Sequence, residues 1–243
     1  MKHLKVEIAV SKIGKYAVSE SGDTVEVVER PGGGISAVIA DGQRSGKPAK
    51  LISNLVVHKV TSLLAEGVRD GAAARAAHDY LRMYRKGKVS ATLAIMSVDI
   101  ESGTLVLSRN SHCPFLVHWS GTGRTVKLEA QSQVIGIHPM VRPVVAEFPL
   151  EPGIFALGFT DGVLNAGRAF GRSMDVEGLF LKAIDGRTPQ KIADYILEEA
   201  ISLDAGRPSD DITVVVLHVG ENPSESKIRR LSVSVPVDFL ERN

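Results

Sequence analysis

The hydrophobic pattern of the first forty residues is that of short β-strands. Apolar positions alternate with other residues over 6–10, and two further apolar runs occupy 25–28 and 35–40. A period of two is typical of a half-buried strand. The sequence Pro-Gly-Gly-Gly at 31–34 separates the last two runs and predicts a turn between them.

After Gly46 the apolar spacing changes to intervals of three and four residues, which places one apolar stripe along a helix. The stripe comprises Leu51, Ile52, Leu55, Val56, Val60, Leu63 and Leu64. An alanine-rich segment at 72–84, directly after Gly71, predicts a second helix.

The rest of the chain returns to strands, with one more long helix. Turn residues separate the apolar runs closely, which favours antiparallel hairpins over long crossovers. The helix is expected at 189–203 with Thr188 as its N-cap. Strands are expected at 92–100, 104–108, 115–119, 125–128, 144–148, 154–159 and 212–219. This order predicts antiparallel sheets covered by helices.

Composition excludes several classes of protein. Of 243 residues 44% are hydrophobic, which is enough for a large core, and the net charge of +1 gives no overall attraction to nucleic acid or membranes. The N-terminus resembles no signal peptide, no apolar run is long enough to span a bilayer, and Cys113 is the single cysteine. We therefore expect a cytoplasmic protein, with Cys113 an ordinary semi-buried thiol.

We expect one domain over residues 1–220 and a tail over 221–243. The tail begins with charged residues and a proline where a packed element would be apolar. Alternation over 231–237 leaves room for a short edge strand or a docking segment.

Aspartates stand at the ends of several predicted strands. Asp41 and Asp161 each follow an apolar strand and precede a glycine, Asp210 and Asp211 directly precede another strand, and Asp23 lies just before a fourth. Asp-Gly is also a common turn dipeptide, so any one of these sites alone favours a structural interpretation. Their repetition favours a cation site instead, and oxygen ligands without a Cys or His cluster indicate Mg²⁺ or Mn²⁺.

Three of these segments resemble the metal-binding signatures of the PPM family of metal-dependent protein serine/threonine phosphatases. They are Asp41-Gly-Gln-Arg-Ser-Gly46, Phe159-Thr-Asp-Gly162 and Ser209-Asp-Asp-Ile-Thr213. Within that family they are most similar to the bacterial branch that contains SpoIIE, RsbU and RsbX. Gly22-Asp23, Ser90-Ala-Thr-Leu and the turn Asn110-Ser-His-Cys-Pro114 also resemble motifs of this branch, in the same order.

The resemblance implies an α+β fold, a four-layer αββα sandwich in which two antiparallel sheets pack face to face with helices on both outer faces. It also implies two Mn²⁺ or Mg²⁺ ions. By that analogy Asp41 bridges the metals, the Gly42 carbonyl holds one of them, and Asp161 and Asp210 supply further ligands. Asp211 is the second choice after Asp210, and Asp23 contributes through water or to an additional metal.

Two ions so placed would lower the pKa of a water, orient it for attack on phosphorus and offset phosphoryl charge, so that no side-chain nucleophile is needed. The family's N-terminal phosphate-binding arginine has no secure match. Arg30 and Arg44 are candidates, although a solvated loop charge is the simpler interpretation of Arg44. His112 is a candidate donor of a proton to the leaving oxygen, or else a structural histidine.

With the first predicted strand so near residue 1, the chain most resembles the stand-alone RsbX type, which implies phosphorylated STAS-domain proteins of a stressosome as substrates and partners. We expect a monomer that binds neither nucleic acid nor membrane. Three alternatives stay open: a phosphatase of a STAS anti-anti-sigma factor, a non-catalytic PPM-like binding module, and a hydrolase of small phosphoesters.

Overall fold

The computed structural model describes residues 3–224 and 227–236 of the chain. Its strands form two five-stranded sheets in which all neighbours are antiparallel. The first sheet has the order β1 (Leu4–Ile13), β10 (Ile212–Glu221), β9 (Ile154–Phe159), β6 (Phe115–Trp119) and β7 (Arg124–Leu128). The second has the order β2 (Asp23–Glu29), β3 (Ile35–Gly42), β4 (Ala91–Asp99), β5 (Thr104–Asn110) and β8 (Val144–Pro149).

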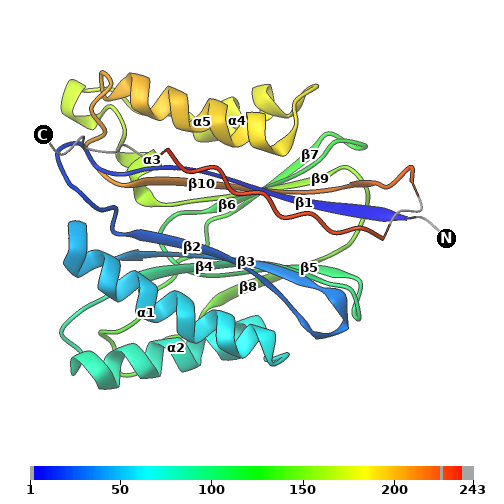
Figure 1. Cartoon of the computed structure of the whole chain (residues 1–243). Helices are drawn as coiled ribbons and strands as arrows, with labels where there is room; N and C mark the ends of the chain where they lie inside the picture. The colour runs from blue at the N-terminus through cyan, green and yellow to red at the C-terminus, as the bar shows by residue number, and fades with distance from the viewer. Residues whose placement is uncertain (1–2, 225–226, 237–243) are drawn as a thin grey trace, which may run out of the picture.

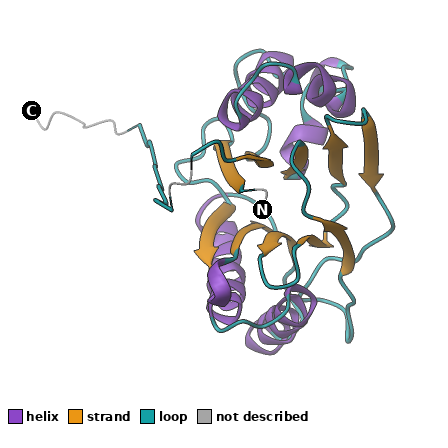
Figure 2. Ribbon diagram, turned by 90° about the vertical axis from the view of Figure 1, so that its right-hand side faces the viewer, coloured by secondary structure: helices purple, strands orange, loops and turns teal. Residues whose placement is uncertain are grey.

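Helices cover the outer face of each sheet (Figure 1). The second sheet is covered by α1 (Gly46–Ala65) and α2 (Asp70–Arg85), and the first by α4 (Val176–Ile184) and α5 (Pro189–Leu203). A short helix, α3 (Asp161–Asn165), and 3₁₀ turns at Pro31–Gly33 and Arg168–Phe170 complete the elements of the described chain. This confirms the predicted four-layer αββα sandwich, and Figure 2 shows the layers end on.

Three apolar cores separate the four layers. The central core joins Met96 and Leu107 of the second sheet to Phe115, Ile154 and Leu217 of the first. One outer core lies between the first sheet and α4 and α5, and the other between the second sheet and α1 and α2. Because both faces of a central strand are covered, its apolar residues need not alternate, and all six residues of β9 are buried.

The sequence pattern places most elements correctly. Thr188 caps α5 as predicted, its side chain accepting a hydrogen bond from the Lys191 N–H. Helix α4 had no counterpart among the predicted elements, and β10 continues to Glu221, one residue into the predicted tail. Residues 231–236 form no strand in the structure, and Val237 lies outside the described residues. In the described chain no helix is both long and apolar enough to cross a bilayer.

Arg30 lies away from the aspartates that the sequence predicts as the cation site. It directly follows β2, at the end of the strand opposite to Asp23, and its guanidinium pairs with Asp70 at 2.8 Å, both side chains being buried. The same guanidinium bonds the Val68 carbonyl oxygen at 3.2 Å. Arg30 therefore ties the α1–α2 connection to the second sheet, and the prediction that it is a candidate for holding substrate phosphate is wrong.

Candidate metal centre

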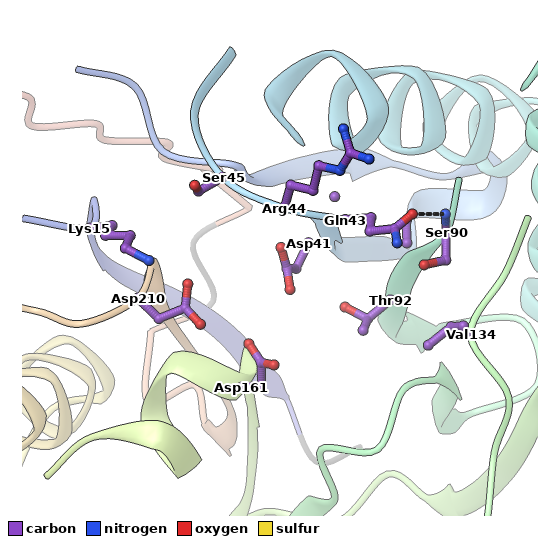
Figure 3. A pocket seen from close by; sticks show the side chains of 12 residues that line it. Lys15, Asp41, Gln43, Arg44, Ser45, Ser90, Thr92, Val134, Asp161 and Asp210 are labelled. Atoms are coloured by element: carbon purple, nitrogen blue, oxygen red, sulfur yellow. Dashed lines mark hydrogen bonds between the residues drawn. The ribbon is translucent and has the colours of Figure 1, made fainter. Parts of the chain in front are cut away.

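The aspartates meet at one end of the sandwich, where both sheets contribute. Asp23 and Asp41 lie opposite each other on β2 and β3 of the second sheet. Asp161 begins α3 directly after β9, and Asp210 lies in the loop before β10 of the first sheet. Asp41, Asp161 and Asp210 line one cavity of about 410 Å³ (Figure 3). The remaining lining residues are Lys15, Gly42, Gln43, Arg44, Ser45, Ser90, Ala91, Thr92 and Val134.

The glycine of each Asp-Gly pair is required by close packing. A Cβ on Gly42 would lie 2.0 Å from the backbone oxygen of Ala49 in α1, and a Cβ on Gly162 would lie 2.1 Å from that of Asp211. Gly42 ends a strand and Gly162 lies in the first turn of a helix, so neither occupies a β-turn. The two glycines let α1 and the 209–211 loop approach the carboxylates, which the turn interpretation of Asp-Gly does not explain.

The carboxylates lie close enough to repel one another, and the nearby positive charges do not compensate this repulsion. Burial raises the pKa of Asp41 to about 9, helped by the negative charges of Asp23, Asp161, Asp210 and Asp211. Burial and the charge of Asp161 also raise the pKa of Asp210. A bound cation would remove this repulsion, because it favours the ionised form of each carboxyl group.

Asp23 links the two sheets at the base of the site. Its carboxylate is fully buried, and Oδ2 accepts hydrogen bonds from Thr160 Oγ1 at 2.8 Å and Thr213 Oγ1 at 2.6 Å. Thr213 lies in β10 of the first sheet, and Thr160 directly follows β9 of the same sheet. Burial raises the Asp23 pKa to about 6 although these two hydroxyls oppose the shift. Oδ1 is buried and has no hydrogen-bond partner among the described residues. An unpaired buried carboxylate oxygen is costly, so this atom fits a role toward a cation or its water.

Replacing Thr213 with valine is expected to lower the free energy of unfolding by about 1–3 kcal/mol, because the isosteric change leaves a buried carboxylate oxygen with one donor fewer. Urea unfolding in chelator measures this loss. Thr122→Val serves as the matched control, since Thr122 lies in an exposed turn and should change the stability little. Equal stability of Thr213→Val and the unchanged protein would contradict the bridging role.

The neighbours Asp210 and Asp211 have different surroundings. Asp210 lines the cavity; its Oδ1 accepts the backbone N–H of Asp211 at 3.0 Å, and its Oδ2 accepts only a long hydrogen bond, 3.4 Å, from the Asn165 side chain. Asp211 is buried, and its two oxygens accept backbone N–H groups of Lys15 at 3.0 Å and Gly22 at 2.9 Å. These contacts favour Asp210 as the ligand and give Asp211 a role in holding the 14–22 loop. The ligand role of either residue stays a prediction.

The donor set fits a partly hydrated hard cation. In the described part of the chain no three or more Asp, Glu, His or Cys side chains are placed closely enough to hold a metal ion together. Mg²⁺ commonly uses only one or two carboxylates and keeps several waters, and Mn²⁺ accepts the same oxygen ligands. Asp41, Asp161 and Asp210 line the same cavity as Gly42 and offer the oxygen atoms that such an ion prefers. That they bind one ion or two stays a prediction.

Three basic side chains surround the carboxylates. His112 Nε2 lies 3.5 Å from Asp161 Oδ2, and this interaction raises the pKa of His112. Arg44 lines the cavity with φ +81°, but its guanidinium is directed away from Asp41 (Figure 3). Lys15 was not predicted, yet its ammonium is directed toward Asp210 (Figure 3), and its charge opposes the rise in the pKa of that carboxyl group.

Cys113 is buried, and burial raises the pKa of its thiol to about 12. The sequence predicts an ordinary semi-buried thiol, and the structure shows a buried one whose raised pKa makes it unreactive.

Comparison with known proteins identifies the family. The family model for Stage II sporulation protein E (SpoIIE) matches residues 31–220. Stage II sporulation protein E of Bacillus subtilis (strain 168) is 23% identical over 238 residues, covering 98% of this chain and 28% of the relative. The Priestia megaterium protein of the same description is 22% identical, covering 89% of this chain and 37% of the relative. The chain thus spans about a third of the length of these curated relatives.

Solved structures share the fold. The PP2C phosphatase domain of SpoIIE from Bacillus subtilis, with a fragment of its regulatory domain, has a TM-score of 0.78 at 22% identity, covering 92% of this chain and 66% of the other. RsbX in complex with magnesium has a TM-score of 0.69 at 17% identity, covering 90% and 100%. The catalytic domain of the serine/threonine phosphatase PstP, with 2 manganese ions, has a TM-score of 0.68 at 18% identity, covering 89% and 99%. With the αββα sandwich and the ordered aspartate motifs, these matches show that the chain belongs to the SpoIIE family and has the PP2C-type phosphatase fold.

Proposed function

We propose that this chain is a Mn²⁺- or Mg²⁺-dependent phosphatase that hydrolyses phosphoserine and phosphothreonine in proteins. The observation that carries the proposal is the convergence of Asp41, Asp161 and Asp210, from both sheets, on one open cavity. A non-catalytic binding module would gain nothing from carboxylates that repel each other in this way. Family membership supports the same activity.

Each side chain of the site has a separate proposed role in hydrolysis. Asp41, Asp161, Asp210 and the Gly42 carbonyl would hold the cations, which when bound supply a water of lowered pKa and offset phosphoryl charge. Water oxygen adds to phosphorus, the phosphorus–oxygen bond to the seryl side chain breaks, and the water gives up one proton, which balances the proton donated to the seryl oxygen. His112, beside Asp161 and with a raised pKa, can give the proton that the departing seryl oxygen takes. The products are inorganic phosphate and the protein with a free seryl hydroxyl group.

Lys15 is the best-placed cation for attracting the substrate phosphate. Lys15→Met is expected to raise KM roughly tenfold while changing kcat little, because the ammonium acts mainly on binding of the dianion. Steady-state kinetics on a phosphopeptide measure this. The control Lys191→Met removes the same charge from the exposed surface of α5. An unchanged KM for Lys15→Met would contradict the role.

We further propose that the physiological substrates are phosphorylated STAS-domain proteins of a stressosome-like complex. The resemblance of the motifs to the RsbX branch supports this, as does the fold shared with a structure described as RsbX in complex with magnesium. Membership of the SpoIIE family favours a STAS anti-anti-sigma factor as the alternative target. Both substrates present a phosphorylated side chain on the same domain type.

One assay distinguishes these possible substrates and tests the dependence on metal. Phosphate release is measured with Mn²⁺ from a phosphorylated stressosome STAS protein, a phosphorylated anti-anti-sigma factor and p-nitrophenyl phosphate. We expect rapid release from one STAS protein and none in chelator. Equal rates on the STAS proteins and p-nitrophenyl phosphate would favour a small-molecule hydrolase, and equal activity with and without Mn²⁺ would refute the metal-dependent mechanism.

A further inference from the structure

We propose that residues 231–235 of the tail form a sixth strand of the second sheet, paired antiparallel with the free edge of β2. In the structure this segment is exposed, and no strand among the described residues pairs with it. The proposal concerns the chain's own tail as the occupant of that edge, and it does not depend on the catalytic activity.

The edge that would receive the tail is open. β1 and β2 are the end strands of their sheets, and they lie on the same side of the sandwich, since Lys12 Nζ of β1 donates to the Asp23 carbonyl oxygen of β2 at 2.6 Å. Apolar residues of both strands are only partly buried against the central core here. They are Leu4, Val6, Ile8 and Val10 of β1 and Val25 of β2. Val27 of β2 is 37% exposed.

The hydrogen-bonding direction of β2 defines which groups are available. The Arg30 N–H donates to the Gly34 carbonyl oxygen within the β2–β3 register, so every second residue back from Arg30 bonds to β3. Val25, Val27 and Glu29 therefore direct their backbone groups outward. Asp23 belongs to the same outward set, and Lys12 and Lys50 cap its carbonyl oxygen. The unsatisfied edge runs from Val25 to Glu29.

The tail has the length, direction and anchor to fill this edge. Arg229 binds Glu29 Oε1 at 2.8 Å and the Gly33 carbonyl oxygen at 2.7 Å. From that point the red C-terminal trace runs back along the sandwich in Figure 1, and Figure 2 shows it standing apart from the body. An antiparallel register continued from the Arg229–Glu29 contact places Leu231 opposite Val27 and Val233 opposite Val25.

The side-chain pattern of the tail selects the same register. Leu231, Val233 and Val235 are 73%, 87% and 68% exposed and alternate with serines. Opposite residues of an antiparallel pair share a face, and Val25 faces the central core. The three apolar side chains would therefore cover the open side of that core, while Ser232 and Ser234 would lie on the face of Glu26. A shift of one residue would reverse this arrangement.

Hydrogen exchange tests the pairing with two matched proline variants. In the proposed register the Val233 N–H donates to β2 and the Ser234 N–H faces solvent, so Val233→Pro should break the strand and Ser234→Pro should leave most of it intact. We expect the Val25 and Val27 amides of the unchanged chain and of Ser234→Pro to exchange roughly tenfold or more slowly than in Val233→Pro. Equal, rapid exchange in all three proteins would overturn the proposal.

A cysteine pair tests which molecule supplies the strand. Val27→Cys with Leu231→Cys brings two thiols to opposite positions, whereas Val27→Cys with Ser232→Cys places them on opposite faces. We expect only the first pair to form a disulfide, within one molecule, on mild oxidation; the buried Cys113 does not interfere. A disulfide found only between two molecules would show that a second copy provides the strand and would refute the intramolecular pairing, as would equal oxidation of both pairs.

Discussion

Asp41→Asn is expected to abolish phosphate release and at the same time to stabilise the metal-free protein. Turnover should fall on the order of a thousandfold or more, since the variant loses the charged group that we propose as a cation ligand between the sheets. The melting temperature in chelator should rise, because the half-buried Asp41 carboxyl group, with its pKa raised to about 9, is more readily ionised in the unfolded chain.

The stability gained by Asp41→Asn in the metal-free protein is expected to depend on pH. Above the ordinary aspartate pKa the unfolded chain loses the proton that folded Asp41 retains, so metal-free stability falls as pH rises from about 4 toward 9. The gain from Asp41→Asn should consequently be larger at pH 7.5 than at pH 5. Thermal unfolding at both pH values measures it. Asp185→Asn, on an exposed helix end, is the control and should show no such gain. A lower melting temperature of Asp41→Asn in chelator would contradict the repulsion described above.

Asp211→Asn is expected to destabilise the fold by about 3 kcal/mol, and Asp210→Asn is not. Both oxygens of buried Asp211 accept backbone N–H groups, so the amide nitrogen of asparagine would face a donor. Asp210 accepts one backbone N–H, on Oδ1, which the carbonyl oxygen of asparagine can still accept, and one long side-chain hydrogen bond on Oδ2. Its neutralisation also removes repulsion from Asp161.

Urea unfolding in chelator, together with Mn²⁺ titration by calorimetry, separates the two neighbours. Asp210→Asn should lose Mn²⁺ affinity with its stability intact. If Asp211→Asn unfolded at the same urea concentration as the unchanged protein and Asp210→Asn unfolded earlier, the two roles would be reversed.

Much of the fold is predictable from local sequence, because burial imposes a period on each element. The helix stripe from Leu51 to Leu64 and the apolar run at 154–159 each identify an element without reference to the rest of the chain. The strand-like alternation over 231–237 is equally clear in the sequence, but alternation alone does not provide a neighbouring strand. Among the described residues no strand pairs with 231–236.

The site is predictable only in part. Asp41 and Asp161 could be identified because each follows an apolar strand within a motif. Lys15 gives no comparable signal, since it reaches the cavity through the pairing of β1 with β10, about two hundred residues away in the chain. Thr160 and Thr213 stand inside the motifs, yet their shared bond to Asp23 depends on how the two sheets are stacked.

The site aspartates come from two separate parts of the sequence, which makes the chain suitable for fragment complementation. A cut in the 150–153 turn would leave Asp23 and Asp41 on one piece and Asp161 and Asp210 on the other. Neither piece alone would carry the full set of proposed cation ligands, so Mn²⁺ binding would report reassembly of the halves. The proposed phosphatase activity would then depend on the association of two interacting proteins, one fused to each fragment.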